Sequence, residues 1–280
     1  MENNGNGRDN KRNNLSSSYE ATKIPIRERQ MLNKVPVVIT IFFWIIKIMA
    51  TTVGETAADL LNAKLNLGLT YTTYIMSGLL LITLIFQFKS RKYVPSIYWL
   101  TVVLISVVGT LGSDNLADNL GVPLGTTTII FLIAMLVTFA AWYTSEKTMS
   151  IHSINTTKRE AFYWLAILFT FALGTAAGDL IAEGLNLGYW RSALLFAVLI
   201  GVVTIAYYSF KMNAVLAFWI AYILTRPFGA SLGDFLSQPR HAGGLGLGTV
   251  GTSVIFLVII LVLVIYLTKS KIDDIKLDEA

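Results

Sequence analysis

The chain repeats one short framework four times, and this duplication constrains its fold more than any other feature of the sequence. In each copy a glycine lies ten residues after a tryptophan, an aspartate lies five residues after the glycine, and a small residue precedes the aspartate. The successive copies contain Trp44, Gly54 and Asp59; Trp99, Gly109 and Asp114; Trp164, Gly174 and Asp179; and Trp219, Gly229 and Asp234. Because internal repeats mark architectures built from one unit, we interpret the chain as a fourfold duplication.

The composition of the chain places this duplication in a lipid bilayer. Of the 280 residues, 54% are hydrophobic and only 14% are charged, and the mean hydropathy is +0.62. This leaves too little polar surface for a water-soluble domain. Since the chain contains no cysteine, disulfides and thiolate metal sites are excluded.

Eight apolar segments have about the length, roughly 20 residues, that a helix needs to cross the hydrocarbon core. They cover residues 36–62, 69–88, 96–117, 126–144, 161–183, 190–210, 214–236 and 249–268. None shows the period of two that is typical of membrane barrel strands. The sequence therefore predicts an all-α polytopic membrane protein, with eight transmembrane helices arranged as four parallel two-helix repeats. Pro36 is predicted to open the first helix, because its fixed φ suits a first helical turn.

The repeats also divide the chain. We expect four repeats between a disordered N-terminal tail and a C-terminal tail, with these boundaries: tail 1–33, repeats 34–93, 94–155, 156–212 and 213–268, and tail 269–280. Inside each repeat the two helices meet at an Asn-Leu-Gly turn, which becomes Gly-Leu-Gly in the last copy. These turns are Asn66-Leu67-Gly68, Asn119-Leu120-Gly121, Asn186-Leu187-Gly188 and Gly244-Leu245-Gly246. Asn and Gly tolerate positive φ, so the turns are predicted to be tight.

The basic residues predict the orientation of the helices in the membrane. Most Lys and Arg lie in the tails and between repeats, whereas the turns inside repeats carry only Lys64, Arg191 and Arg240. By the positive-inside rule, both termini and the loops between repeats face the cytoplasm. The net charge of +5 is therefore a topology signal, and we expect no nucleic-acid partner.

Four tandem two-helix units with one tryptophan each resemble a family of bacterial membrane proteins built from a fourfold repeat of unknown function. Trp44, Trp99, Trp164 and Trp219 match the tryptophan of that family, and the resemblance covers about residues 34–268. It implies an eight-span protein of the bacterial cytoplasmic, or inner, membrane. It implies no substrate, so function has to be inferred from the residues.

The glycine of each framework predicts how the first helices of the repeats pack. Gly54, Gly109, Gly174 and Gly229 are each followed four residues later by Ala, Ser or Gly. Such small-xxx-small pairs let another helix backbone come close, so the four first helices are predicted to pack around a common axis. The four tryptophans lie near helix ends, where indole rings commonly anchor at the membrane interface. We interpret them as anchoring or packing residues and not as ligands.

The four repeated aspartates are the candidate functional groups. Acidic residues inside membrane helices are costly and usually functional, and helices around one axis can turn their carboxylates to a shared cavity. We therefore expect Asp59, Asp114, Asp179 and Asp234 to form a cation or proton site, with metal ligation as the specific hypothesis. The alternative is structural: each aspartate caps or bridges a neighbouring helix.

Three charged residues depart from the repeat, because their counterparts in the other copies are uncharged. Glu55 lies four residues before Asp59, so the first repeat presents two carboxylates on one helix face. Lys47 lies two turns earlier on a similar side, and Arg226 lies in the first helix of the fourth repeat. We expect Lys47 and Arg226 to be charge partners of the acids. Arg226 acts either as a structural bridge to Glu55 or an aspartate, or as a gating or substrate-binding residue.

The charge balance of these groups leads to the predicted function. Five carboxylates against two basic groups require protons or a bound cation in a low dielectric. Oxygen ligands suit Mn²⁺, Mg²⁺ or Ca²⁺ more than Zn²⁺ or Cu⁺. We predict a transporter of a small cation, either a divalent metal or a proton-coupled substrate, with the bilayer and that substrate as its partners and no cofactor. The sequence does not determine the oligomeric state.

Three other functions remain open. A channel fits four units around an axis, although the chain has no recognisable filter segment. A structural or sensory membrane protein would bind no transported ion. An intramembrane enzyme with paired aspartates is the third, but P-loop, HExxH and nucleophile-elbow motifs are absent from the sequence, and we predict no enzyme.

Overall fold

The computed structural model describes residues 33–64 and 68–273, and within them the fold is all-α. Eight of its helices are long and apolar enough to cross a membrane, which confirms the predicted fold class. They are α3 (Ile41–Asp59), α4 (Leu69–Lys89), α5 (Pro95–Asp114), α6 (Leu124–Glu146), α7 (Thr157–Asp179), α8 (Tyr189–Phe210), α9 (Ala214–Ser237) and α10 (Gly248–Ser270). Of the two expected tails, residues 1–32 and 274–280 lie outside the described residues.

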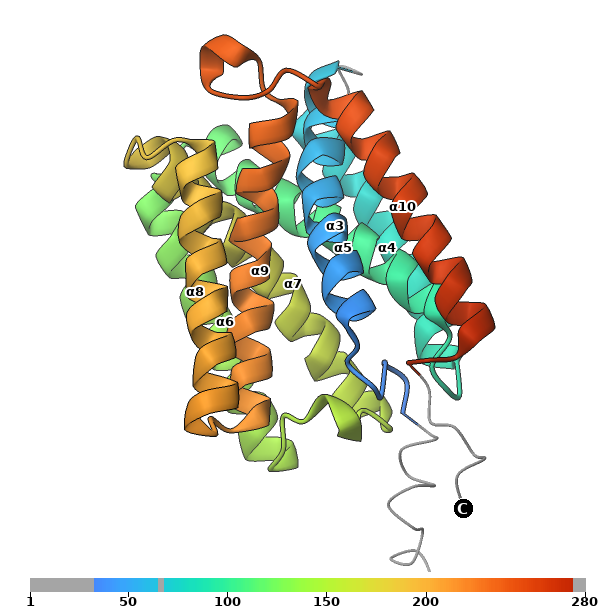
Figure 1. Cartoon of the computed structure of the whole chain (residues 1–280). Coiled ribbons are helices and arrows are strands. Elements are labelled where there is room, and N and C mark those ends of the chain that lie inside the picture. The colour runs from blue at the N-terminus through green and yellow to red at the C-terminus, as the bar shows by residue number, and fades with distance from the viewer. Residues whose placement is uncertain (1–32, 65–67, 274–280) are drawn as a thin grey trace, which may run out of the picture.

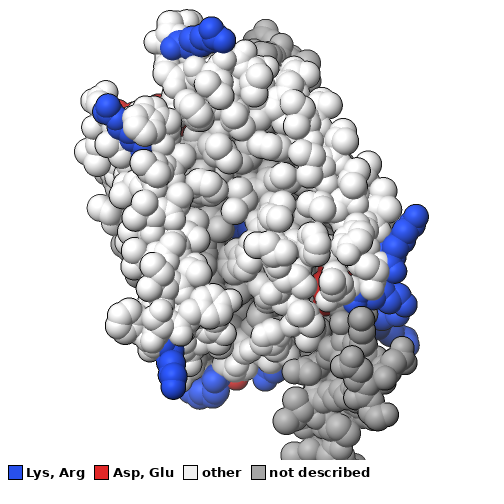
Figure 2. Space-filling view, in the orientation of Figure 1, with Lys and Arg blue, Asp and Glu red and all other residues white. Residues whose placement is uncertain are grey.

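The first helices of the four repeats form a closed inner ring. In this ring α3 packs against α5 and α9, and α7 packs against the same two helices. Burial separates the inner from the outer helices. In the apolar stretch of each helix, 61%, 61%, 61% and 50% of the residues are buried for α3, α5, α7 and α9, and 11% to 28% for the other four. The inner helices therefore surround an axis, while α4, α6, α8 and α10 lie on the outside (Figure 1). The flank visible in Figure 2 is almost free of charged side chains, which gather towards the two ends.

Each outer helix packs on the inner helix of the next repeat. The contacts join α4 to α5, α6 to α7 and α8 to α9, and α10 closes the circle by packing on α3. The two helices of one repeat are consecutive in the chain, but their main contacts cross the repeat boundary. A single repeat therefore cannot bury its own inner helix, and the fold needs all four.

The two ends of the ring differ in their connections. We call the end with the turns inside repeats the turn end, at the top of Figure 1, and the end with the loops between repeats the loop end. At the turn end, three inner helices continue directly after their aspartates as π-helices, namely η1 (Leu60–Lys64), η2 (Asn115–Asn119) and η4 (Leu180–Gly184). The fourth, α9, instead ends at Ser237 before the 3₁₀ turn η5 (Arg240–Ala242).

The predicted glycine turns follow these segments. Gly68, Gly121, Gly188 and Gly246 have φ of 75°, 65°, 80° and 79°, a region that suits glycine because it has no Cβ. Asn66 and Leu67, the first two residues of the first turn, lie outside the described residues.

The first helix begins at Ile41, so the prediction that Pro36 opens it was wrong. Residues 33–38, which we call the strap, instead cross the loop end without helical structure. The Lys34 amide donates to the Ile154 carbonyl at 3.0 Å, and the Tyr93 amide donates to the Asn33 carbonyl at 3.0 Å. These bonds, to repeat 2 and to the end of repeat 1, take the place of bonds within a helix, and Val35 is fully buried.

Candidate functional site

Four layers of side chains stack inside the inner ring, and each repeat contributes one residue to each layer. The positions lie three, seven, eleven and fifteen residues after the tryptophan, so they share one helix face. From the loop end they are the lysine layer (Lys47, Val102, Ile167, Tyr222), the arginine layer (Thr51, Ser106, Phe171, Arg226), the glutamate layer (Glu55, Thr110, Thr175, Ala230) and the aspartate layer (Asp59, Asp114, Asp179, Asp234). All twelve residues of the first three layers are buried.

The framework glycines allow the ring to close around these layers. A Cβ at each of them would overlap the arginine-layer residue of the next repeat. The four pairs are Gly54 with Ser106, Gly109 with Phe171, Gly174 with Arg226, and Gly229 with Thr51. The last pair joins repeat 4 to repeat 1, so one rule of packing holds around the whole ring. The close approach of the backbones brings side chains of all four repeats within reach of one another.

The framework tryptophans lie in the interior of the loop end and not at its lipid-facing surface. Trp99, Trp164 and Trp219 are only 2%, 3% and 4% exposed, while Trp44 is half-buried. Tyr98 bridges two repeats, because its ring lies 5.1 Å from that of Trp99 and 5.6 Å from that of Trp164. Of the two expected roles, anchoring or packing, this burial supports aromatic packing between inner helices, at contacts each worth about 0.5–1.5 kcal/mol.

The aspartate layer lines a single cavity of about 400 Å³ at the turn end, which we call the acidic cavity. The sequence correspondence alone singled out five carboxylates, and all five line it. Two further acids, Asp118 and Glu183, complete the set. They lie on the π-helices η2 and η4, four residues after Asp114 and Asp179. The sequence analysis did not single them out, although their i, i+4 spacing from the aspartates was a usable signal.

Three of these acids come close enough to hold one ion. Glu55, Asp179 and Asp234 each offer a carboxylate oxygen, and these three oxygens lie within 4.8 Å of one another. Oxygen ligands of Mg²⁺ and Ca²⁺ lie about 2.0–2.6 Å from the metal, so such a spacing suits coordination of a single hard cation. Asp59 and Asp114 line the same cavity outside this closest group.

Arg226 lies beneath the acidic cavity and bonds to all three other inner helices. Its Nη2 lies 3.3 Å from Glu55 Oε2, and its Nη1 donates to the Thr51 carbonyl at 2.8 Å. Its Nε donates to the Phe171 carbonyl at 3.3 Å. Nη2 also donates to the hydroxyls of Thr110 and Thr175. Full burial and five partners give this guanidinium a defined position on the axis.

Lys47 occupies the next layer and has aromatic neighbours in place of a carboxylate. Its Nζ lies 4.4 Å from the ring centroid of Phe171 and 4.2 Å from that of Tyr222, which are cation–π distances. Within the described part of the chain, this Nζ has no hydrogen-bond partner. The expected pairing of Lys47 with an acid is therefore not seen, and a second basic side chain lies below Arg226.

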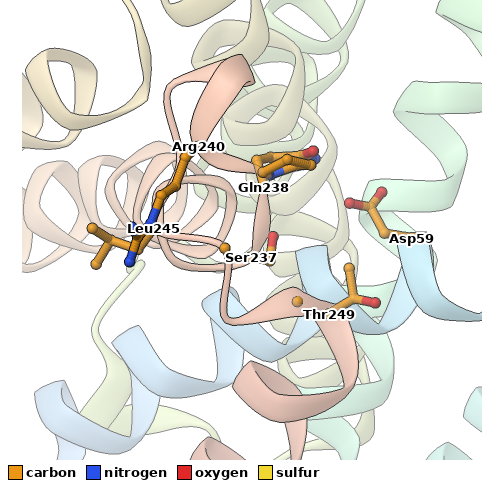
Figure 3. A pocket seen from close by; sticks show the side chains of 9 residues that line it. Asp59, Ser237, Gln238, Arg240, Leu245 and Thr249 are labelled. Carbon is orange, nitrogen blue, oxygen red and sulfur yellow. The ribbon is translucent and has the colours of Figure 1, made fainter.

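A second cavity, of about 810 Å³, lies beside the acidic one at the junction of repeats 4 and 1. Figure 3 shows Asp59, Ser237, Gln238 and Thr249 among the side chains that line it. Asp59 and Gln238 line both cavities. The space lies where repeat 4 departs from the pattern, because α9 has no π-helix after its aspartate.

The strap covers the loop end of the axis. Lys34, which the sequence analysis did not single out, donates to Glu160 Oε2 at 2.7 Å in a buried ion pair. Gln87 Nε2 donates both to Glu160 Oε1 at 3.1 Å and to the Lys34 carbonyl at 3.0 Å. Nearby, Tyr93 donates to Asp273 at 2.7 Å, and burial together with that carboxylate raises the pKa of Tyr93. The phenol therefore stays protonated as a donor.

Four stretches of the chain match one known family, the Repeat of Unknown Function (DUF347). They cover residues 42–93, 97–148, 162–213 and 217–273, and each contains most of one inner helix, the outer helix that follows it and one member of every layer. No curated protein and no solved structure shows a significant match to the chain. Since the four matches cover most of its length, the chain belongs to the family of proteins built from the Repeat of Unknown Function (DUF347).

Proposed function

We propose that the protein transports a small cation, which binds in the acidic cavity. The observation that carries this proposal is the convergence of Glu55, Asp179 and Asp234, whose oxygens lie within 4.8 Å of one another among membrane-spanning helices. Carboxylates gathered in a low dielectric need protons or cations to balance them. Arg226 balances only part of the seven acids that line the cavity.

The donor atoms favour a hard divalent cation. All ionisable groups that line the cavity are carboxylates, and Asn62 and Gln238 add amide groups. Such a set suits Mn²⁺, Mg²⁺ or Ca²⁺. The same carboxylates take up protons when the metal leaves, so exchange of the metal for protons is the simplest form of coupling.

The closed axis supports a carrier over an open channel. Below the cavity the arginine and lysine layers are buried, and two of their members, Arg226 and Lys47, are basic residues. Beyond them lie the aromatic rings and the strap. A permeant cation therefore meets both steric and electrostatic barriers, and its passage requires rearrangement of the inner ring. The proposal assigns binding and movement of an ion, with no covalent chemistry.

The proposed membrane placement follows from the basic residues. The loop end faces the cytoplasm and the turn end faces the opposite side of a bacterial inner membrane, in accordance with the positive-inside rule. Reporter fusions near Arg91, Thr156 and Lys211 are expected to report the cytoplasm, and fusions near His241 the other side. An external C-terminus would contradict this placement.

The test of transport uses the purified full-length protein in proteoliposomes. Flux of Mn²⁺, Mg²⁺, Ca²⁺ and monovalent ions is measured with and without a pH gradient. We expect saturable divalent flux that is lost in Asp234→Asn and kept in Glu146→Gln. Glu146 is a suitable control because it lies at the loop end in surface ion pairs with Lys158 and Arg159. Folded wild-type protein that moves none of these ions would refute the proposal and leave a structural or sensory role.

A further inference from the structure

Glu55 takes part in two interactions: it is one of the three clustered acids, and it forms an ion pair with Arg226. Its carboxylate is one of the three that suit a single cation, and the same carboxylate lies 3.3 Å from the Arg226 guanidinium. A divalent ion at the three acids and the guanidinium at Glu55 therefore compete for one group. Two cations held a few ångströms apart in a buried site repel each other strongly.

We propose that Arg226 is a tethered competitor of the transported cation: binding of the ion displaces the guanidinium from Glu55, and return of the guanidinium releases the ion. This inference rests on the proposed function and adds a release step to it. Arg226 is thus a residue that sets affinity and turnover, in addition to being a bridge between helices.

The pseudo-symmetry of the ring supports a specific role for this pair. Around the ring, the counterparts of Arg226 are Thr51, Ser106 and Phe171, and those of Glu55 are Thr110, Thr175 and Ala230. Repeats 2 and 3 therefore close the same packing without charge in either layer. In the described residues, Glu55–Arg226 is the one ion pair within the inner ring. Packing alone does not require it.

The contacts of the guanidinium explain how a local exchange can reach the whole ring. Its partners lie on α3, α5 and α7, and its own helix is α9. When the guanidinium leaves Glu55, its bonds to the two threonine hydroxyls are broken or rearranged as well. All four inner helices then lose a shared contact, which is the kind of change that a carrier needs between its two states.

Lys47 biases the guanidinium towards Glu55. The Lys47 Nζ lies 4.4 Å from the Phe171 ring centroid, and the Arg226 Cζ lies 5.3 Å from the same centroid. The two basic side chains thus flank one aromatic ring, and the buried Lys47 side chain fills the space below Arg226 towards the loop end. Movement of Arg226 in that direction is therefore obstructed, which favours its return to Glu55.

The test combines Mn²⁺ binding to detergent-purified protein with Mn²⁺ flux in proteoliposomes. In Arg226→Ala we expect Mn²⁺ to bind at least about tenfold more tightly, because a neighbouring charge commonly shifts an ionic equilibrium by one unit or more. Flux is expected to fall at least about tenfold, because the tightly bound ion leaves slowly. Millimolar guanidinium, added to fill the vacated space, should weaken Mn²⁺ binding in Arg226→Ala and leave the wild type unchanged.

Two further variants keep the test decisive if Arg226→Ala does not fold. Arg226→Lys retains the charge but loses the planar fork, and Thr175→Val removes one acceptor of Nη2; both should tighten Mn²⁺ binding. Arg191→Gln is the control, because Arg191 is exposed and lies on an outer helix. A purely structural bridge predicts weaker or unchanged binding in every Arg226 variant, and that result would overturn the inference.

The failure of this inference can be told from the failure of the proposed function. If wild-type protein binds Mn²⁺, Asp234→Asn abolishes binding and the Arg226 variants change nothing, only the competitor role is refuted. If wild-type protein does not bind Mn²⁺, or binds it independently of Asp234, both proposals fall.

Discussion

The two ends of the inner ring are built from the same four helices, yet one end holds a cavity lined by acids and the other a packed aromatic core. At the turn end, seven carboxylates line a cavity of about 400 Å³, and three inner helices change to π-helical geometry directly after their aspartates. At the loop end, buried tryptophans and tyrosines pack across repeat boundaries, and the strap is pinned by hydrogen bonds. One end lines a cavity with acidic side chains, whereas the other packs aromatic rings together and covers them with the strap.

The difference shows how the molecule can support a costly cluster of acids. Burial of apolar and aromatic groups stabilises a fold, whereas gathered carboxylates in a low dielectric destabilise it. Here the two are separated along one axis by the arginine and lysine layers. Packing at the loop end thus offsets the unfavourable free energy of the acids at the turn end. Substitutions at the loop end should therefore reduce stability, and those at the turn end should reduce function.

The largest expected effect lies between the two ends, at the glycine contacts. Gly174→Leu or Gly229→Leu should prevent stable folding, because even a Cβ at these positions overlaps Arg226 or Thr51. Val258→Leu is the matched control, since Val258 is 54% exposed on an outer helix. The measurement is the yield and thermal unfolding temperature of detergent-purified protein. Equal tolerance at both kinds of position would mean that the ring does not close as described.

The next effect should separate the loop end from the turn end. Lys34→Ala leaves Glu160 buried without its cation, which costs about 3–5 kcal/mol when one partner of a buried pair is removed. Lys158→Ala breaks an ion pair whose lysine is 63% exposed, and such surface pairs contribute only about 0–1 kcal/mol. Chemical denaturation in detergent compares the two, and Lys34→Ala with Glu160→Gln should recover stability. Similar losses for Lys34 and Lys158 would place the strap outside the stabilising core.

At the turn end, the expected loss is in function and not in stability. Asp179→Asn and Asp234→Asn replace a carboxylate by an amide of nearly the same shape that is cheaper to bury. We expect folded protein with Mn²⁺ flux reduced at least about tenfold, because each variant removes one charged ligand of the closest group. Asp59→Asn and Asp114→Asn should reduce flux less. Flux and unfolding temperature are measured on the same samples, and unstable variants with normal flux would favour the structural interpretation of the aspartates.

The smallest effect is expected at the rim of the acidic cavity. Asp118 lines this cavity but is exposed, so solvent screens its charge. Asp118→Asn should therefore change Mn²⁺ flux by only about twofold to threefold, a small part of the effect at buried sites. The comparison with Asp179→Asn tests whether burial sets the importance of each acid. A loss as large as that of Asp179→Asn would move the ion-binding position outwards to η2.

Much of this architecture can be read from local patterns in the sequence. Hydrophobic length predicts eight spans because the bilayer sets the length of a helix. The regular spacing of Trp44, Gly54 and Asp59 in four copies predicts four equivalent units, and glycine in a small-xxx-small pair predicts close helix contact. The shared cavity of the four aspartates also follows from this pattern once the helices are placed around one axis.

What local patterns do not contain is the contact between distant parts of the chain. Glu55 and Arg226 are 171 residues apart, and their meeting depends on the closure of the ring between repeats 4 and 1. Three other features also depend on which neighbour occupies the space beside a helix. They are the burial of Lys34 against Glu160, the packing of each outer helix on the next repeat, and the π-helical ends of three inner helices. The sequence by itself therefore determined the helices, their repetition and the candidate acids, whereas the tertiary structure decided which charges meet, because that depends on how four similar surfaces pack into one ring.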